Sequence, residues 1–67
     1  MINIHLNGET RGIETATDLA RLVDELALPS KRIAVELNGS VIRRADWDGT
    51  QVNDGDKIEV VHFVGGG

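Results

Sequence analysis

Cysteine is absent from the chain. Without a thiol, the protein can form no disulfide, offer no thiolate nucleophile and build no cysteine-based zinc site. Aromatic residues are almost as scarce, since Trp47 and Phe63 are the only two among 67 residues. A core this small leaves little room for a pocket around a large planar cofactor, so we expect no bound cofactor and no metal. These shortages favour a carrier or binding module over an enzyme.

Long apolar runs are missing too. No segment approaches the roughly 20 apolar residues that a membrane-spanning helix needs, and no charged and then apolar leader follows Met1. We therefore expect a cytoplasmic protein with no membrane partner. The apolar residues, 40% of the chain, must all contribute to one small core, which predicts a single domain over residues 1–67 with a tail at 65–67. We expect a monomer when the protein is free.

Basic residues are fewer than acidic ones. The chain has seven basic and eleven acidic residues, which gives a net charge of −4. This balance argues against a nucleic acid partner, which would require clustered Lys and Arg. It predicts instead that a partner with a basic groove would attract the chain. The two basic pairs, Lys31-Arg32 and Arg43-Arg44, are interpreted as solvated surface.

Alternating apolar and polar residues predict several short strands. They cover Met1–Leu6, Glu9–Glu14, Arg32–Leu37, Ser40–Arg43 and Lys57–Val64. Asn7-Gly8 and Asn38-Gly39 stand between consecutive strands, and Asn-Gly is the dipeptide that best accepts the positive φ angles of a two-residue hairpin turn. The first four strands are therefore expected to form two hairpins.

A helix is predicted between the hairpins, over Asp18–Leu28. Its apolar stripe has the spacing i, i+3, i+4 and i+7, at Leu19, Leu22, Val23 and Leu26. Thr15 or Thr17 is expected to cap its N-terminus, with Asp18 in the first turn. Pro29 is expected to end it, because proline lacks the N–H that the helix needs.

The order ββαβββ predicts an α+β protein with a β-grasp fold, in which one helix packs on one face of a mixed sheet. The first and last strands are expected to be parallel neighbours at the centre. Ile58 and Val60 would then face the helix with Ile2 and Ile4. On the open face, Val61 and Phe63 would lie beside Asn3 and His5.

An apolar pair on an open sheet face suggests a partner site, to which Val64 would add a third contact. An equally open alternative is that the loop around Trp47 covers one or both of Val61 and Phe63. Trp47 itself is interpreted as a lid over one end of the core.

Other polar clusters have structural explanations. His5 and His62 could lie close together on adjacent strands, where they would be paired surface groups and a poor metal site. Asp46–Gly49 is expected to form a loop or a single helical turn, and Asp54 and Asp56 fit a turn better than an acid–base pair.

The final stretch, Asn53–Gly67, resembles the C-terminal signature of the ThiS family of sulfur carriers. The shared features are a turn with an Asp-Gly-Asp core, an apolar strand and a terminal Gly-Gly, and the resemblance extends over essentially the whole chain. Gly65 departs from the pattern, since many relatives have alanine or a larger residue there.

The resemblance implies that a ubiquitin-activating-type enzyme uses ATP to adenylate the carboxylate of Gly67. A cysteine desulfurase would supply the sulfur that converts the adenylate to a thiocarboxylate, and thiazole synthase would accept it. Gly65 and Gly66 would thread into the partner sites.

The chemistry of the tail agrees with this implication. A carboxylate is a poor electrophile until it is adenylated, and a terminal glycine is the narrowest residue that can enter a buried active site. Three extended glycines reach about 10 Å. The alternatives are a molybdopterin-synthase-type sulfur carrier, a ubiquitin-like protein modifier and a non-covalent β-grasp interaction module; glycines by themselves also occur as frayed ends.

Overall fold

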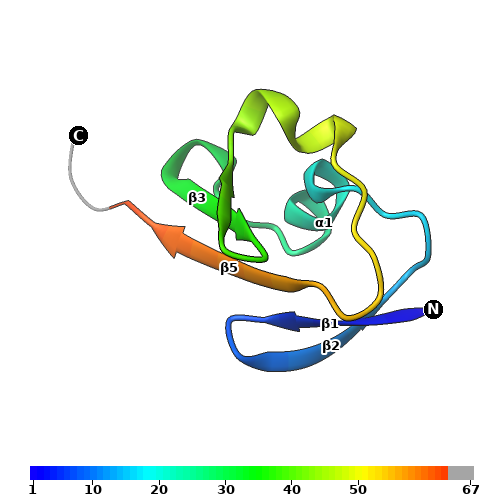
Figure 1. Cartoon of the computed structure of the whole chain (residues 1–67). Helices are drawn as coiled ribbons and strands as arrows, with labels where there is room; N and C mark the ends of the chain where they lie inside the picture. The colour runs from blue at the N-terminus through cyan, green and yellow to red at the C-terminus, as the bar shows by residue number, and fades with distance from the viewer. Residues whose placement is uncertain (64–67) are drawn as a thin grey trace.

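The computed structural model describes residues 1–63, in which one five-stranded sheet is joined to one α-helix (Figure 1). In chain order the elements are β1 Ile2–Leu6, β2 Glu9–Ile13, α1 Leu19–Glu25, η1 Ser30–Arg32, β3 Ile33–Leu37, β4 Ser40–Ile42, η2 Arg44–Gly49 and β5 Lys57–His62, where η marks a 3₁₀ helix. The predicted order ββαβββ is confirmed.

The last strand occupies the centre of the sheet, whose strand order is β2-β1-β5-β3-β4. β5 runs parallel to β1, with His5 opposite Lys57 and Leu6 opposite Ile58, and all other neighbours are antiparallel. A mixed sheet with parallel first and last strands at its centre and a single helix on one face is the β-grasp arrangement that the element order predicts.

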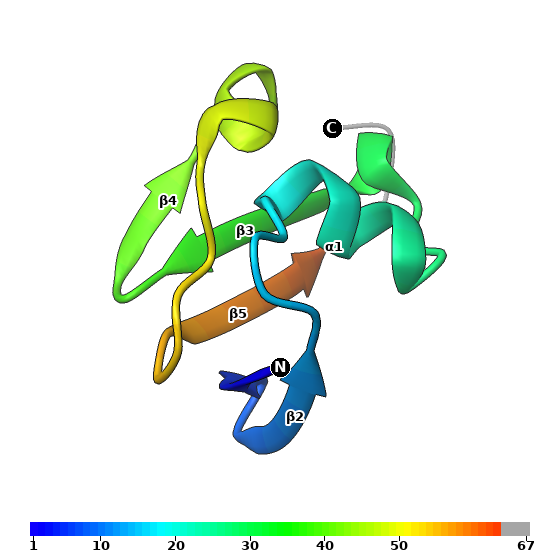
Figure 2. The ribbon, with the colours of Figure 1, turned by 90° about the vertical axis from the view of Figure 1, so that its right-hand side faces the viewer.

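Helix α1 lies across one face of the sheet (Figure 2). The buried hydrophobic side chains come from both layers and from the segments between them: Ile4, Ile13, Leu19, Leu22, Val23, Ile33, Val35, Trp47, Val52 and Ile58. Ile2 and Val60 are partly buried against this core. The predicted division of β5 into a core face and an open face is therefore correct.

The start of α1 differs from the prediction of a threonine cap. Asp18 is the N-cap, because its backbone is extended and its Oδ1 accepts a hydrogen bond from the Arg21 N–H at 2.8 Å. Thr17 is fully buried and its hydroxyl donates to the Glu14 carbonyl at 2.7 Å. A buried hydroxyl requires a hydrogen-bond partner. The Thr17 hydroxyl has that partner in the loop before the helix and therefore does not cap the helix.

The helix also ends earlier than Pro29. Its last residue is Glu25, and Ala27 follows with a φ of 56°. The Ala27 N–H donates to the Asp24 carbonyl at 3.0 Å, so a left-handed residue ends the helix before the proline is reached.

Within residues 1–63, no helix is long and apolar enough to cross a membrane.

Strand ends differ from the predicted ones by one or two residues. Met1, Glu14, Arg32 and Arg43 lie just outside their strands, and β5 ends at His62. Arg32 belongs to the 3₁₀ turn η1, which begins directly after Pro29. Val64, where the last strand was expected to end, lies outside the described residues.

Two asparagine side chains attach the hairpin turns to β5. Asn38 Oδ1 accepts from the Lys57 N–H at 2.9 Å, and Asn38 Nδ2 donates to Asp56 Oδ1 at 3.0 Å. On the other side, Asn7 Oδ1 accepts from the Val60 N–H at 2.7 Å and Asn7 Nδ2 donates to the Val60 carbonyl at 3.3 Å. Because β1 ends at Leu6, the Asn7 side chain replaces a missing strand partner.

We expect Asn7→Gly and Asn38→Gly each to lower the free energy of unfolding by about 1–2 kcal/mol, since each removes two hydrogen bonds to β5 or its preceding turn. Both asparagines have positive φ angles, 48° and 52°, which glycine adopts without strain. Urea denaturation measures the loss. Wild-type stability in both variants would show that these side-chain bonds contribute nothing.

Ala27→Gly should raise the free energy of unfolding by about 0.5 kcal/mol, because relief of the left-handed strain outweighs the added freedom of the unfolded chain. The matched control is Ala20→Gly inside α1, which should cost about 1 kcal/mol. Thermal unfolding of the two variants compares them directly. An equal destabilisation by both changes would contradict the role of Ala27 as a strained C-terminal residue.

Candidate functional site

The end of β5 places two apolar side chains on the open face of the sheet. Val61 is 53% exposed and Phe63 is 55% exposed. Trp47 is only 4% exposed and belongs to the core, and its segment η2 contacts α1 on the other face. The interpretation in which the Trp47 loop covers these residues is therefore wrong, and the lid interpretation of Trp47 agrees with its burial.

The neighbours of Val61 differ from the predicted ones. His5 lies opposite Lys57, four residues before Val61, so the end of β1 pairs with the start of β5 and does not reach Val61. Val61 lies opposite Ala34 in β3, and Val41 of β4 is on the same face, with 66% of its surface exposed. The apolar surface thus extends across β3 and β4, away from β1.

The two histidines do not lie together. His62 lies opposite Ile33, which is buried on the helix side, whereas His5 lies opposite Lys57 on the open face. The prediction that they are close neighbours is wrong, because residues of even and odd number in β5 point to opposite faces. In the described part of the chain, no group of three His, Cys, Asp or Glu residues could hold a metal ion.

The acidic turn before β5 is structural. Asp54 Oδ1 accepts from the Asn3 N–H at 2.8 Å, and Asp56 Oδ2 accepts from the Asn53 N–H at 2.8 Å. Both carboxylates therefore hold the turn and the start of the sheet, as the turn interpretation predicts. Asp46 and Asp48 belong to the 3₁₀ helix η2.

The backbone at the end of β5 is held on both of its edges. On one edge, Asn7 bonds to Val60; on the other, the Phe63 N–H donates to the Arg32 carbonyl at 2.7 Å. The strand is thus fixed up to the last described residue. The remaining predicted site residues, Val64, Gly65, Gly66 and Gly67, lie outside the described residues.

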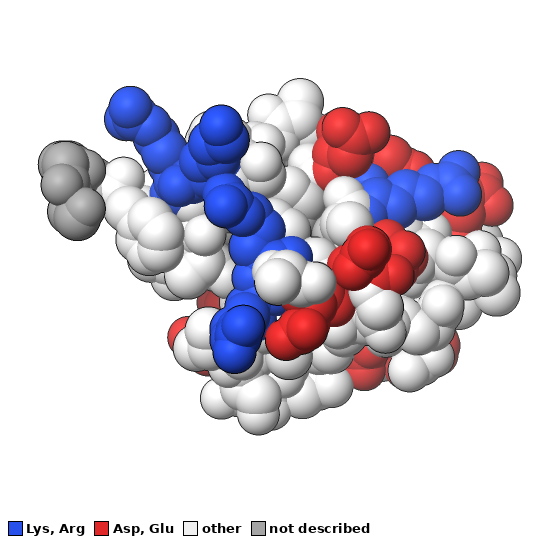
Figure 3. Space-filling model, turned by 90° about the horizontal axis from the view of Figure 1, so that it is seen from above, with Lys and Arg blue, Asp and Glu red and all other residues white. Residues whose placement is uncertain are grey.

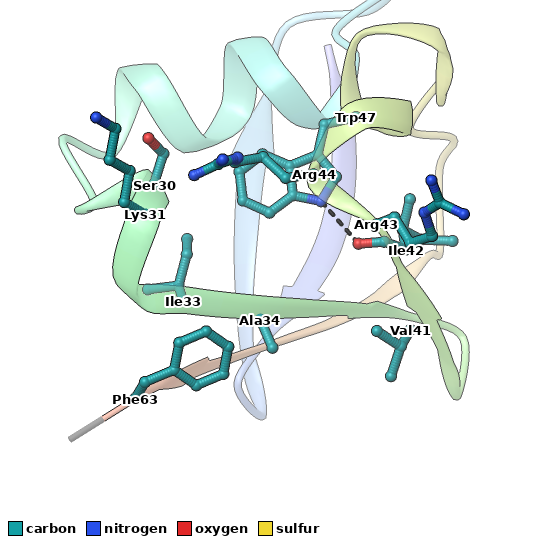
Figure 4. A pocket seen from close by; sticks show the side chains of 10 residues that line it. All are labelled: Ser30, Lys31, Ile33, Ala34, Val41, Ile42, Arg43, Arg44, Trp47 and Phe63. Atoms are coloured by element: carbon teal, nitrogen blue, oxygen red, sulfur yellow. Dashed lines mark hydrogen bonds between the residues drawn. The ribbon is translucent and has the colours of Figure 1, made fainter. Parts of the chain in front are cut away.

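A hollow of about 400 Å³ opens beside Phe63. Its apolar lining consists of Ile33, Ala34, Val41, Ile42, Trp47 and Phe63 (Figure 4). The indole N–H of Trp47 donates to the Ile42 carbonyl at 2.9 Å, which fixes the ring as one wall. We call this feature the basic hollow because of its charged lining.

The charged residues that line the basic hollow are Lys31, Arg43 and Arg44, and no acidic residue lines it. Figure 4 shows Lys31 at one end and Arg43 at the other. Figure 3 shows basic side chains gathered on one side of the molecule, while acidic side chains predominate on the other.

Sequence reasoning missed this cluster by treating the two basic pairs as independent solvated surface. Lys31 stands before β3, and Arg43 and Arg44 follow β4. The β3–β4 hairpin reverses the chain and brings these positions to the same end of the sheet. The only signal in the sequence was that each basic pair flanks the outer end of a predicted hairpin strand.

This arrangement suits binding better than catalysis. It combines an exposed apolar surface at the end of β5 with a concave surface that has one sign of charge. The one fully buried polar side chain among residues 1–63, Thr17, is explained by its hydrogen bond to Glu14. Such a surface can bind another protein.

Comparison with known proteins agrees with this interpretation. The ThiS family model matches residues 4–67. A sulfur carrier protein ThiS from Bacillus subtilis is 36% identical over 67 residues, which cover 96% of this chain and 98% of the relative. The crystal structure of the thiamine biosynthesis protein ThiS from Geobacter metallireducens has a TM-score of 0.88 at 33% identity, and the match covers 98% of this chain and 100% of that one.

Longer relatives also match. A thiazole synthase from Magnetococcus marinus is 41% identical over 66 residues, which cover 98% of this chain and 20% of that protein. The chain therefore spans about a fifth of this relative. Because the family match runs from residue 4 to residue 67 and a relative of similar length agrees nearly throughout, the chain belongs to the ThiS family, the family of the sulfur carrier protein of Bacillus subtilis.

Proposed function

We propose that this chain carries sulfur for thiamine biosynthesis as a thiocarboxylate on Gly67. The observation that supports the proposal most strongly is that the ThiS family match extends through the three terminal glycines. The anchored end of β5 adds physical support, because a carrier must present its reactive end from a rigid base. The lack of cysteine leaves the chain no thiol on which to hold sulfur.

The chemistry proceeds in two stages. The Gly67 carboxylate attacks the α-phosphate of ATP, which forms an acyl-adenylate and releases pyrophosphate. With sulfide as the source, sulfur attacks the acyl carbon, and AMP leaves with one of the original carboxylate oxygens. With a protein persulfide as the source, the attack forms an acyl disulfide, which a thiol then reduces to the thiocarboxylate.

Other proteins supply the catalysis in this proposal. A ubiquitin-activating-type enzyme binds ATP and makes the adenylate, a cysteine desulfurase provides the persulfide, and thiazole synthase accepts the sulfur. Support for the last partner is that a thiazole synthase from Paramagnetospirillum magneticum contains a region 39% identical to this chain. The carrier itself would hold no cofactor, and we place the exchange in the cytoplasm, where thiols stay reduced.

The glycines suit delivery of a reactive group into a buried site. Extended, Gly65–Gly67 would reach about 10 Å beyond Val64, without a side chain to obstruct a narrow channel. Val61, Phe63 and Val64 would contact the partner at the channel entrance. The carrier would thus bind through its folded surface and react through its end.

Deletion of Gly67 should abolish loading, because it withdraws the carboxylate by about 3.5 Å and a reaction centre tolerates little misplacement. An added residue after Gly67 should do the same, whereas Gly67→Ala should load more slowly. The assay incubates the chain with ATP, the adenylating enzyme and sulfide and then measures intact mass. Wild type should gain the mass that replaces one oxygen by sulfur.

All three variants should unfold at the wild-type temperature, because the buried core that the structure describes in residues 1–63 runs from Ile4 to Ile58. Full loading of a chain without Gly66 and Gly67 would contradict the proposal and favour a non-covalent β-grasp module. Isopeptide linkage to lysine in the cellular pool would favour a protein modifier. Loading with transfer only to a molybdopterin synthase would favour the related sulfur pathway.

Phe63→Ala should weaken binding to the adenylating enzyme about 10-fold if Phe63 is a partner contact. Just over half of this side chain is exposed, so we expect a stability loss of about 1–2 kcal/mol, below the 3–5 kcal/mol of a buried Phe. Thr10→Ala, on the edge strand β2, is the control. Titration calorimetry measures affinity; a large loss of stability with unchanged affinity would assign Phe63 to the core instead.

A further inference from the structure

The basic hollow concentrates positive charge in a protein whose net charge is −4. Three of the seven basic residues line it, and no carboxylate does. Among residues 1–63, the ion pairs are Arg21–Glu25 and Lys57–Glu59, so neither involves Lys31, Arg43 or Arg44. The charge of the hollow is therefore available to a partner.

The lining between these cations is apolar except for Ser30. Trp47 and Ile33 form buried walls, while Val41 and Phe63 leave more than half of their surfaces exposed. A small anion would satisfy the cations and leave the apolar surface uncovered. An occupant that fits both features has carboxylates around an apolar side chain, which is a property of an acidic protein segment.

The basic hollow is connected to the end of β5. Phe63 is one of its walls, and the Phe63 N–H bonds to the carbonyl of Arg32, the neighbour of Lys31. An occupant would therefore touch the strand that leads to Gly65–Gly67. Binding there would orient the chain end toward whatever protein supplies the occupant.

We propose that the basic hollow receives an acidic segment of the adenylating enzyme, with one apolar side chain of that segment inserted between Lys31 and Arg44. The inference rests on the proposed function and adds the chemistry of the partner surface. It reverses the expectation drawn from net charge, which was a partner with a basic groove. Local charge decides the matter, because the Debye length at physiological salt is only about 8 Å.

Nucleic acid fits the hollow less well. Three cations offer few phosphate contacts, and the acidic residues elsewhere would repel a polyanion longer than the hollow. A short acidic segment of a folded protein avoids this repulsion. Nucleic acid binding is kept as an outcome of the test.

The test compares two charge-reversal variants of the whole chain with the same net charge. Lys31→Glu with Arg44→Glu reverses the basic hollow. Arg11→Glu with Arg21→Glu, on β2 and α1, is the matched control, because neither residue lines the hollow. Lys31→Gln with Arg44→Gln is a milder version if reversal impairs folding, and thermal unfolding checks all three.

Association with the adenylating enzyme is measured by stopped flow across a range of salt, and loading is measured by intact mass. For the hollow variant we expect affinity to fall about 10-fold or more, the salt dependence of the association rate to weaken and the KM for loading to rise with kcat little changed. The control should stay within about 3-fold of wild type, because exposed charges away from a contact contribute little.

The outcomes separate this inference from the proposed function. If wild type is loaded and the two double variants behave alike, the acidic-segment proposal is overturned while the sulfur-carrier proposal stands. If the adenylating enzyme neither binds nor loads the wild-type chain, both proposals are overturned. A third measurement adds a single-stranded oligonucleotide to the carrier in the absence of the enzyme. Saturable binding by wild type that is lost in the hollow variant would assign the hollow to nucleic acid and also overturn the inference.

Discussion

The hydrogen bonds that hold β5 between β1 and β3 are the constraint on which the rest of this structure depends. The last strand in the sequence is the central strand of the sheet, so neither hairpin has its full set of neighbours until β5 is in place. Asn3 with Asp54 and Asn7 with Val60 join residues 51 and 53 positions apart. Such long-range bonds can form only after the chain has paid the entropy of closing a large loop.

The same constraint prepares the chain end for its proposed work. A central strand has neighbours on both edges, which makes its backbone the best supported in a sheet. Asn7 extends that support beyond the end of β1, and the Phe63 N–H continues the contact with the β3 side at the Arg32 carbonyl. The residues that would carry sulfur thus follow a firmly held segment, so that the folded domain can define where a narrow chain end begins.

Two surfaces with different physical properties meet at this end. The open face contributes apolar side chains, of which Val61 and Val41 are examples, and the basic hollow contributes fixed positive charge. Apolar area supplies affinity without direction, whereas charges select partners and orient them. Phe63 belongs to both surfaces, and therefore a partner that contacts it can use both contributions at once.

The sequence by itself determined the element order, both hairpin turns and the two faces of β5. These follow from local rules: Asn-Gly favours positive φ angles, and alternation separates Ile58 from Val61. The terminal glycines, with their proposed chemistry, were also apparent from composition and resemblance alone. No knowledge of a neighbouring element was needed for any of them.

Tertiary structure alone decided the helix cap, the histidine placement and the charged hollow. The sequence predicted Thr17 as a possible cap. In the folded chain its hydroxyl is buried and bonds to the Glu14 carbonyl, and Asp18 caps the helix instead. The parallel register of β1 and β5 set His5 apart from His62, and the β3–β4 hairpin brought Lys31 to the same hollow as Arg43 and Arg44. Strand register and burial are properties of contacts between remote segments, and no local pattern encodes which side chains those contacts will bring together.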